Sequence, residues 1–229
     1  MTPALKVSAL RFAYDADAVL DGISFEVAAG ESVGLAGANG SGKSTLLWCA
    51  AGLLRAAGEV GIFGERLTKE VLTKIGMVFQ NPEDQLFMPT LAQDLALPLL
   101  NSGVKRDIAH ARAEACLREF GLERASERPA SQLSLGQRKR AAVALALIRR
   151  PELLLMDEPT AELDGRAVRQ LGETLRDLPV AKLIASHDLR FLREVTTRVV
   201  LLRGGRVLAD GSTDEVLADQ DLLSLADLV

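Results

Sequence analysis

Residues 37–45 read Gly-Ala-Asn-Gly-Ser-Gly-Lys-Ser-Thr and decide the fold of this chain. An apolar run at residues 33–36 precedes them and a second one at residues 46–51 follows, which predicts a strand, a glycine-rich loop and a helix. In this context the complete pattern G-x-x-x-x-G-K-[ST] indicates a phosphate-binding loop. The competing interpretation is an ordinary strand–turn–helix with glycines for flexibility, and the full pattern disfavours it.

Glycines in such a loop let successive backbone N–H groups converge on one point, at the positive end of the following helix, where they hold phosphate oxygens. Lys43 would supply a mobile positive charge for the β- and γ-phosphates, and the hydroxyl of Ser44 a ligand for Mg²⁺. The nucleotide contacts predicted from this loop are Gly37, Asn39, Gly40, Ser41, Gly42, Lys43, Ser44 and Thr45.

Two adjacent carboxylates follow another apolar run. Residues 153–156 are typical of a strand buried on both faces, and Asp157 and Glu158 come directly after it. Ligands of doubly wound sheets bind beyond the carboxyl ends of the strands, so both acids are expected beside the phosphate loop. Asp157 would hold Mg²⁺ through its water shell, and Glu158 would orient or deprotonate the attacking water. A helix cap is the competing interpretation, which the apolar strand disfavours.

Three further features complete a recognisable set. Residues 133–137 read Leu-Ser-Leu-Gly-Gln and precede a long predicted helix. Gln80 and His187 each follow a predicted strand, at residues 76–79 and 180–186. Together with the phosphate loop and the paired acids, in this order, these features resemble the ATPase subunit of ATP-binding cassette (ABC) transporters over essentially the whole chain.

The resemblance implies ATP and Mg²⁺ as cofactors and a role for each motif. Residues 37–45 would be the Walker A loop, residues 133–137 the signature motif, residues 153–157 the Walker B strand and residues 161–164 the D-loop. Its catalytic residues would be Glu158 as the catalytic glutamate, His187 as the switch histidine near the γ-phosphate, Gln80 of the Q-loop, and Lys43.

The same resemblance implies a metal site and a composite nucleotide site. Ser44, Gln80 and Asp157 would be the Mg²⁺ ligands. The signature-motif contacts would come from Ser134, Gly136 and Gln137, and they would reach the ATP of a second ATPase subunit. That subunit, a second copy or a paralogue, would pair head to tail with this one.

Tyr14 has a weaker pattern. It lies upstream of the phosphate loop, where the family places an aromatic residue that stacks on adenine, and such stacking contributes roughly 1–3 kcal/mol. The competing interpretation is a strand aromatic packed in the β subdomain. Tyr14 ends its predicted strand and is the only tyrosine of the chain, which favours stacking.

Leu135 departs from the family, whose signature motif usually reads Leu-Ser-Gly-Gly-Gln. If this position requires φ > 0 or a close approach to phosphate, leucine would cost about 1–2 kcal/mol. The groups expected to contact phosphate are the Ser134 hydroxyl, the Gly136 backbone and the helix N-terminus, and all three are retained. We therefore expect a working but weakened half-site.

The predicted fold class is α/β: a P-loop NTPase (RecA-like) core with a small antiparallel β subdomain and an inserted α-helical subdomain. Residues 1–229 are predicted as a single ABC ATPase domain, with the helical subdomain at about residues 81–150. Expected strands are 5–14, 23–28, 32–36, 59–63, 75–79, 153–157, 180–185, 199–203 and 206–209. Expected helices are 43–54, 90–100, 106–120, 136–150, 166–177, 213–218 and 222–228.

Composition sets limits on partners and location. The 27 basic and 31 acidic residues give a net charge of −4, which argues against a nucleic-acid partner. The sequence contains no run of 18 apolar residues and no signal-peptide pattern from Met1 onward, so we expect a cytoplasmic protein that reaches the inner face of the membrane only through partner subunits. Cys49 and Cys116 have no metal or redox spacing, which favours buried thiols.

Residues 78–90 read Val-Phe-Gln-Asn-Pro-Glu-Asp-Gln-Leu-Phe-Met-Pro-Thr and look like the Q-loop of energy-coupling-factor importers, most similar to the cobalt and nickel systems. This resemblance implies two ATPase subunits, a transmembrane scaffold and a separate membrane subunit that binds the substrate. Metal selectivity would lie in another subunit, because no cluster of ligand residues is visible here. The alternatives are an importer of another solute, such as the vitamin biotin, and a soluble ABC ATPase outside transport.

The segment from Gln80 to Asp94 is the predicted docking site of the scaffold. Its acids, Glu83, Asp84 and Asp94, stand beside three large apolar residues at positions 86–88. Exposed apolar residues rimmed by charge mark interaction sites. In the resembling importers, a short scaffold helix that bears arginine docks in this groove.

Overall fold

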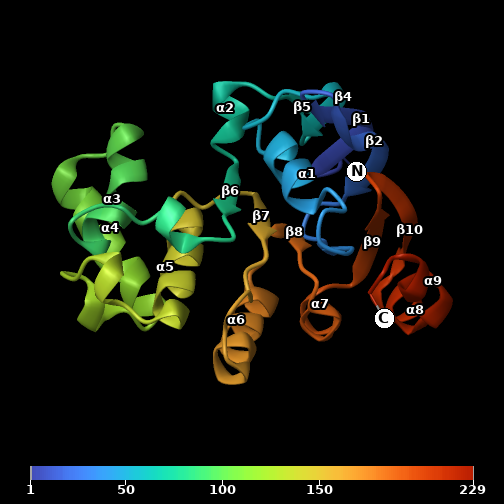
Figure 1. The fold of residues 1–229 in the computed structure, drawn as a ribbon. Helices are drawn as coiled ribbons and strands as arrows, with labels where there is room; N and C mark the ends of the chain where they lie inside the picture. The colour runs from blue at the N-terminus through green and yellow to red at the C-terminus, as the bar shows by residue number, and fades with distance from the viewer. Residues whose placement is uncertain (1, 229) are drawn as a thin grey trace.

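A six-stranded sheet in the order β10-β9-β3-β8-β7-β6 forms the centre of the described chain (Figure 1). β10 pairs antiparallel with β9, and the other neighbours pair parallel. The computed structural model describes residues 2–228; Met1 and Val229, the ends of the predicted single domain, lie outside the described residues. The strands are β3 (Ser32–Ala36), β6 (Ile75–Val78), β7 (Leu153–Asp157), β8 (Ala181–Ala185), β9 (Arg198–Arg203) and β10 (Arg206–Ser212).

Helices cover both faces of this sheet, which explains why its inner strands are apolar throughout. Every residue of β7 and β8 is buried. Alternate residues of β7 pack into two core clusters, because successive side chains of a strand point to opposite faces. One cluster includes helix α1 (Lys43–Ala50), and the other includes α6 (Gly165–Asp177) and α7 (Leu189–Val195).

A smaller antiparallel sheet packs on the α1 side in the order β2-β1-β4-β5. Its apolar residues join those of α1 in the first core cluster. Its strands are β1 (Leu5–Tyr14), β2 (Asp17–Val27), β4 (Ala57–Ile62) and β5 (Glu65–Arg66). The blue and cyan segments of Figure 1 show this sheet above the end of the molecule that holds β9 and β10.

Three helices gather at the opposite side of the sheet and have their own apolar core. They are α3 (Leu91–Asn101), α4 (Arg106–Glu119) and α5 (Leu135–Leu147), and we call them the helical subdomain. α5 also packs against β6, which ties the subdomain to the sheet. The remaining helices are α2 (Lys69–Leu72), α8 (Thr213–Ala218) and α9 (Gln220–Leu225), with 3₁₀ turns at Pro82–Asp84, Glu123–Ala125 and Ala130–Gln132.

The predicted fold class is confirmed, with differences at the ends of elements. α1 ends at Ala50 rather than at residue 54, because Gly52 has φ 72° and the N–H of Leu53 bonds to the carbonyl of Trp48, as in a Schellman cap. β2 begins at Asp17 rather than at residue 23, since it pairs with β1 along its whole length.

The prediction also missed the start of β4 and the helices α2 and α7. β4 begins at Ala57 rather than at residue 59, and Ala57 pairs with Arg11 of β1. α7 was not predicted, although Asp188 accepts hydrogen bonds from the N–H groups of Arg190 and Phe191 and so begins the helix.

Candidate active site

The loop at residues 37–42 joins β3 to α1 and has a backbone that requires glycine at two positions. Gly37 has φ 154°, and a Cβ there would lie 2.5 Å from the Oγ of Ser41. Gly42 precedes α1 with φ 101°, in the left-handed region. The loop and the start of α1 face a cleft of about 510 Å³ that is lined by Val19, Asn39, Gly40, Gly42, Lys43, Ser44, Thr45, Gln80, Glu158 and His187.

The cleft therefore unites most of the predicted site residues from four strand ends. Gly37 and Ser41 shape the loop without lining the cleft, and Ser41 is buried. Asp157 lies just beside the cleft, where it bonds to Ser44. Val19, which the sequence analysis did not single out, lines the cleft, and no pattern in the sequence marks it.

Lys43 is buried at the centre of the cleft. Its Nζ donates hydrogen bonds to the carbonyls of Gly37, at 2.7 Å, and Ala38, at 3.2 Å, and lies 3.8 Å from Oε1 of Glu158. Burial lowers the pKa of Lys43, while the nearby carboxylates of Glu158 and Asp157 oppose that shift. The ammonium is thus held among oxygens at the mouth of the loop, where a phosphate would compete for it.

Ser44 and Asp157 form a pair of hard oxygen donors. The Ser44 hydroxyl donates to Oδ1 of Asp157 over 3.0 Å. Burial raises the pKa of Asp157, and the hydrogen bond from Ser44 opposes that rise. Gln80 and Ser44 both line this cleft and the adjoining groove, and Asp157 lines that groove as well. A hydroxyl, an amide and a carboxylate together fit Mg²⁺, which takes oxygen ligands and keeps several waters.

Glu158 has a left-handed backbone, with φ 44°, which costs a non-glycine residue about 1–3 kcal/mol. Its Oε2 lies 2.9 Å from Nδ1 of His187 and accepts a hydrogen bond from the His187 N–H. Its Oε1 is buried and has no hydrogen-bond partner among the described residues. One carboxylate oxygen is therefore fixed, and the other is left in the cleft as an acceptor for a proton.

The signature residues lie in a different cleft, of about 330 Å³, together with the D-loop. The Ser134 hydroxyl accepts from the N–H of Gln137, and the Gln137 side chain accepts from the N–H of Ser134, which forms a capping box at the start of α5. Gly136 lines the same cleft. Within one chain, these residues do not face the cleft of the phosphate loop.

Leu135 begins α5 and is not among the residues with positive φ. The backbone strain that a positive φ would cause at Leu135 is therefore absent. Its side chain is half-buried and lines both the signature cleft and the groove beside Gln80.

Tyr14 does not line the cleft. Its side chain is 43% exposed at the end of β1, and its ring makes an edge contact with Phe12, with 4.8 Å between the centroids. The structure thus shows the strand-aromatic contact, and stacking of Tyr14 on adenine stays a prediction.

The prediction that the apolar and acidic residues of the docking segment are all exposed is partly wrong. Phe87 is 69% exposed, and Glu83 and Asp84 are exposed beside a groove of about 500 Å³. Leu86, however, is buried in the core of the helical subdomain. Asp94 is buried too, because its Oδ1 accepts from the N–H groups of Phe87 and Met88. Asp94 therefore shapes the segment and does not contribute surface charge.

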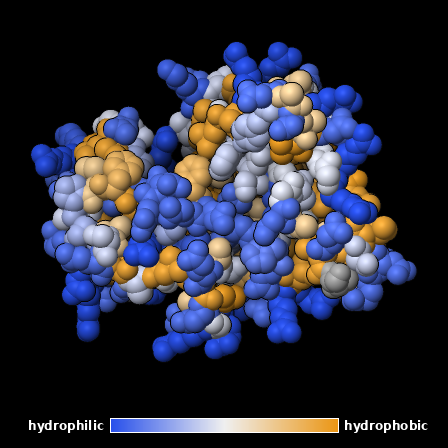
Figure 2. All heavy atoms as spheres, in the orientation of Figure 1, coloured by the Kyte–Doolittle hydropathy of each residue, from blue (hydrophilic) through white to orange (hydrophobic). Residues whose placement is uncertain are grey.

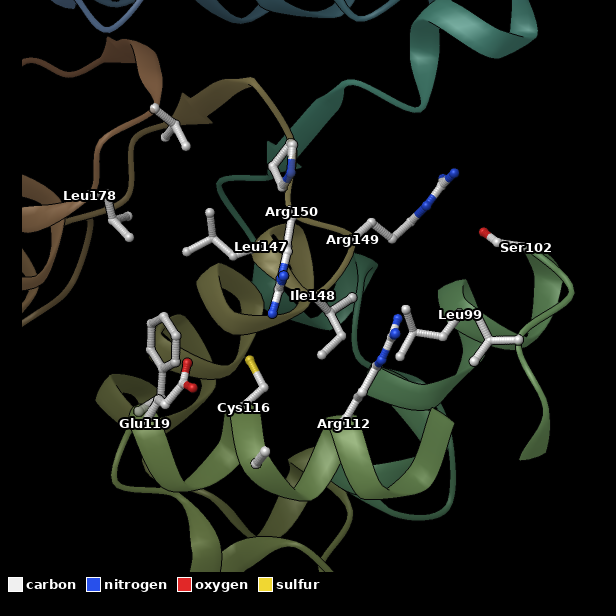
Figure 3. Close-up of a pocket in the computed structure, with 15 residues that line it drawn as sticks. Leu99, Ser102, Arg112, Cys116, Glu119, Leu147, Ile148, Arg149, Arg150 and Leu178 are labelled. Atoms are coloured by element: carbon white, nitrogen blue, oxygen red, sulfur yellow. The ribbon is translucent and has the colours of Figure 1, made fainter. Parts of the chain in front are cut away.

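A second cavity, of about 590 Å³, lies between the helical subdomain and the end of the sheet far from the phosphate loop. Figure 3 shows Arg112 and Arg150 extending across it from opposite sides, with Cys116 on the α4 side. Burial raises the pKa of the Cys116 thiol to about 11, and both cysteines are free and buried, as predicted. No residue of the predicted site lines this cavity, so it is not the candidate site.

The surface gives no sign of a membrane segment within residues 2–228, where none of the helices combines the length and the apolar character that a bilayer span needs. Figure 2 shows hydrophilic residues over most of one face, with hydrophobic residues in separate patches. Among the described residues, no group of three or more His, Cys, Asp and Glu side chains is placed to hold a metal ion.

Comparisons with known proteins show the family of this chain. Residues 20–161 match the family described as ABC transporter. The chain is 39% identical to the nickel import ATP-binding protein NikO of Rhodobacter capsulatus, over 100% of this chain and 97% of that protein. It is 38% identical to the energy-coupling factor transporter ATP-binding protein EcfA of Methanocaldococcus jannaschii, over 96% and 82%.

A solved structure is similar over the full length. It is cbiO1 from Clostridium perfringens, described as part of the ABC transporter complex cbiONQ. The TM-score is 0.85 and the sequences are 30% identical, over 100% of this chain and 96% of that one.

Proposed function

This chain belongs to the ABC transporter family as an ATP-binding and ATP-hydrolysing subunit, and from this premise we propose that it powers an energy-coupling-factor importer for nickel or cobalt ions. The observation that carries the catalytic part is the position of Glu158, held between Lys43 and His187 beside the phosphate loop. The nickel and energy-coupling-factor relatives support the transport part.

In this proposal, the loop N–H groups and Lys43 hold the phosphates of ATP. Lys43 exchanges its bonds with the Gly37 and Ala38 carbonyls for phosphate oxygens, which are stronger partners because they are charged. Ser44, Gln80 and Asp157 would hold Mg²⁺, which when bound would supply positive charge against the phosphate oxygens.

Glu158 then acts as the base. Its free Oε1 accepts a proton from the attacking water, while the bond from Oε2 to His187 keeps the carboxylate in place. The imidazole of His187 is 57% exposed and lines the cleft, which supports a contact with the γ-phosphate.

The signature cleft supports a head-to-tail dimer. Ser134, Gly136 and Gln137 lie apart from the phosphate loop of their own chain, so we infer that they complete the site of a second ATPase subunit. ATP would then form part of the interface, and hydrolysis would release it. ATP binding would favour the closed dimer and hydrolysis the open one, because ATP binds the closed dimer better than the open one.

The groove beside Gln80 supports docking of a transmembrane scaffold. Glu83 and Asp84 line this groove with negative charge, and Phe87, three residues further along the chain, is an exposed apolar residue. An arginine-bearing scaffold helix fits this chemistry, and it would hold the chain at the inner face of the membrane. A separate membrane subunit would select the transported ion.

A complementation experiment tests the composite site. Lys43→Ala removes the phosphate contact and Ser134→Arg blocks the signature cleft, so each variant alone should lack ATPase activity. A mixture should regain activity, because one heterodimer site combines an intact loop with an intact signature motif. The wild-type rate should also rise more steeply than linearly with protein concentration. A fully active monomer would refute the dimer.

An uptake experiment tests the substrate. The chain is co-expressed with the membrane proteins encoded beside it, and cells are assayed for uptake of radioactive nickel, cobalt and biotin. Nickel or cobalt uptake that disappears with Glu158→Gln supports the proposal. Uptake of biotin alone would identify the chain as the ATPase of a vitamin importer, and no uptake with active ATP hydrolysis would favour a function outside transport.

A further inference from the structure

Lys139 is a buried lysine that the mechanism above does not use. Its side chain is 2% exposed, on the first turns of α5. Its Nζ donates to the backbone carbonyl of Gln80 over 2.5 Å and to that of Glu158 over 3.2 Å. One ammonium thus joins three motifs: the Q-loop, the catalytic glutamate and the helix that begins with the signature residues.

The surroundings of Lys139 act on its pKa in two opposite directions. Burial lowers its pKa, whereas the nearby carboxylates of Glu162, Glu158 and Asp157 oppose that shift. A buried cation that is bonded to two carbonyls is costly to disturb, because removal of either partner leaves the other unpaired.

The residue whose carbonyl accepts this second hydrogen bond from Lys139, Glu158, has a strained backbone. Glu158 has φ 44°, a conformation that persists only where its surroundings hold it. A second bond, from the Glu158 N–H to the carbonyl of Ala185, fixes the other side of the same residue. Lys139 and Ala185 therefore hold the backbone of Glu158 between α5 and β8.

We propose that Lys139 is a positioning residue for ATP hydrolysis, which ties the backbone of the catalytic glutamate and of the Q-loop glutamine to the signature helix. This inference rests on the proposed role of Glu158. When α5 moves, the Glu158 carboxylate and the Gln80 segment move with it. Closure of the dimer on the signature side thereby adjusts the base on the other side of α5.

The test is Lys139→Met, which keeps the volume and removes the charge and the hydrogen bonds. ATP affinity should stay unchanged, because Lys139 does not line the phosphate cleft. The turnover number of the full-length chain should fall about 10- to 100-fold, as expected when a catalytic group is misplaced by a fraction of an ångström. Wild-type hydrolysis in the same assay tests the proposed function separately.

Lys182 offers a matched control. It is also buried, at 4% exposure, and its ammonium also donates to two backbone carbonyls, those of Leu178 and Val180. It lies on β8, away from the cleft. Lys182→Met should lose about as much thermal stability as Lys139→Met and should keep its turnover number. Equal loss of turnover in both variants would overturn the proposal.

A double substitution separates positioning from a purely structural role. If Lys139 acts through Glu158, adding Lys139→Met to Glu158→Gln should lower single-turnover hydrolysis less than threefold further, since coupled residues are not additive. If the double variant instead shows the product of the fold losses that the two single variants show, the two residues act independently and the proposal is overturned. If Lys139→Met does not fold, Lys139→Gln is measured in its place. Because it keeps one donor, its turnover number should fall less than 10-fold but clearly more than that of Lys182→Gln, and equal loss in these two variants would overturn the proposal.

Discussion

Oε2 of Glu158 lies 2.9 Å from Nδ1 of His187, although 29 residues separate them in the chain. They meet because β7 and β8 are parallel neighbours, whose carboxyl ends lie at one edge of the sheet. This contact fixes one oxygen of the carboxylate and leaves the other toward Lys43. The carboxylate of Glu158, the proposed base, is therefore oriented in the structure without a nucleotide.

Glu158→Gln should keep ATP affinity and lose roughly 10²–10⁴-fold in turnover, because an amide does not accept the proton of water. The ATP-bound dimer should accumulate and be visible by size-exclusion chromatography. Glu152→Gln is the control, since Glu152 is exposed just before β7, at the other end of that strand. A normal rate of hydrolysis in Glu158→Gln would mean that another residue is the base, and His187 would be the first to test.

Lys43→Ala should instead lose nucleotide binding. The ammonium is the buried charge at the mouth of the loop, and a hydrogen bond to a charged group contributes about 1.5–3 kcal/mol. Binding of a fluorescent ATP analogue should weaken roughly 10- to 100-fold. Lys69→Ala should bind normally, because Lys69 is exposed at the start of α2 and does not line the cleft. Unchanged affinity in Lys43→Ala would contradict the assignment of the loop.

Reversal of Glu83 and Asp84 to lysine should abolish co-purification with the transmembrane scaffold and leave ATP binding intact. Both side chains are exposed beside the groove and neither lines the phosphate cleft. Asp107→Lys with Glu119→Lys gives the same charge change on exposed positions of α4 and should not affect assembly. Normal assembly of the Glu83 and Asp84 double variant would place the docking surface elsewhere.

Asp94→Ala should make the backbone of the docking segment at Phe87 and Met88 more mobile. The substitution leaves the N–H groups of Phe87 and Met88 without their buried acceptor, which costs about 1–3 kcal/mol. Urea denaturation should show a lower free energy of unfolding, and hydrogen exchange should show faster exchange at residues 87 and 88. Unchanged exchange there would mean that Asp94 does not hold the segment.

The sequence was sufficient to predict those parts of the site whose functional residues are contiguous or directly follow a recognisable strand. The phosphate loop is one contiguous pattern, and Asp157 and Glu158 directly follow a strand whose burial is evident from its composition. Parallel pairing then brings these motifs together without further information. The fold class and the meeting of Lys43, Glu158 and His187 were predictable for this reason.

The remaining features depend on contacts that no residue pattern encodes. Lys139 bonds to backbone carbonyls, one of them 59 residues away, and any residue type supplies a carbonyl. The burial of Asp94 and Leu86 follows from how the helical subdomain packs, so composition alone placed them wrongly at the surface. The end of α1 depends on Gly52, whose positive φ terminates the helix, and a glycine at this position is visible in the sequence.

The place of β3 in the sheet has a consequence for biosynthesis. β3 leads into the phosphate loop, yet its neighbours β8 and β9 are made last among the parallel strands. At the usual speed of a ribosome, β8 follows β3 by roughly 8–30 s. During that interval the loop has no sheet to hold it. A nascent chain interrupted before β8 therefore carries the complete loop sequence without a working phosphate site.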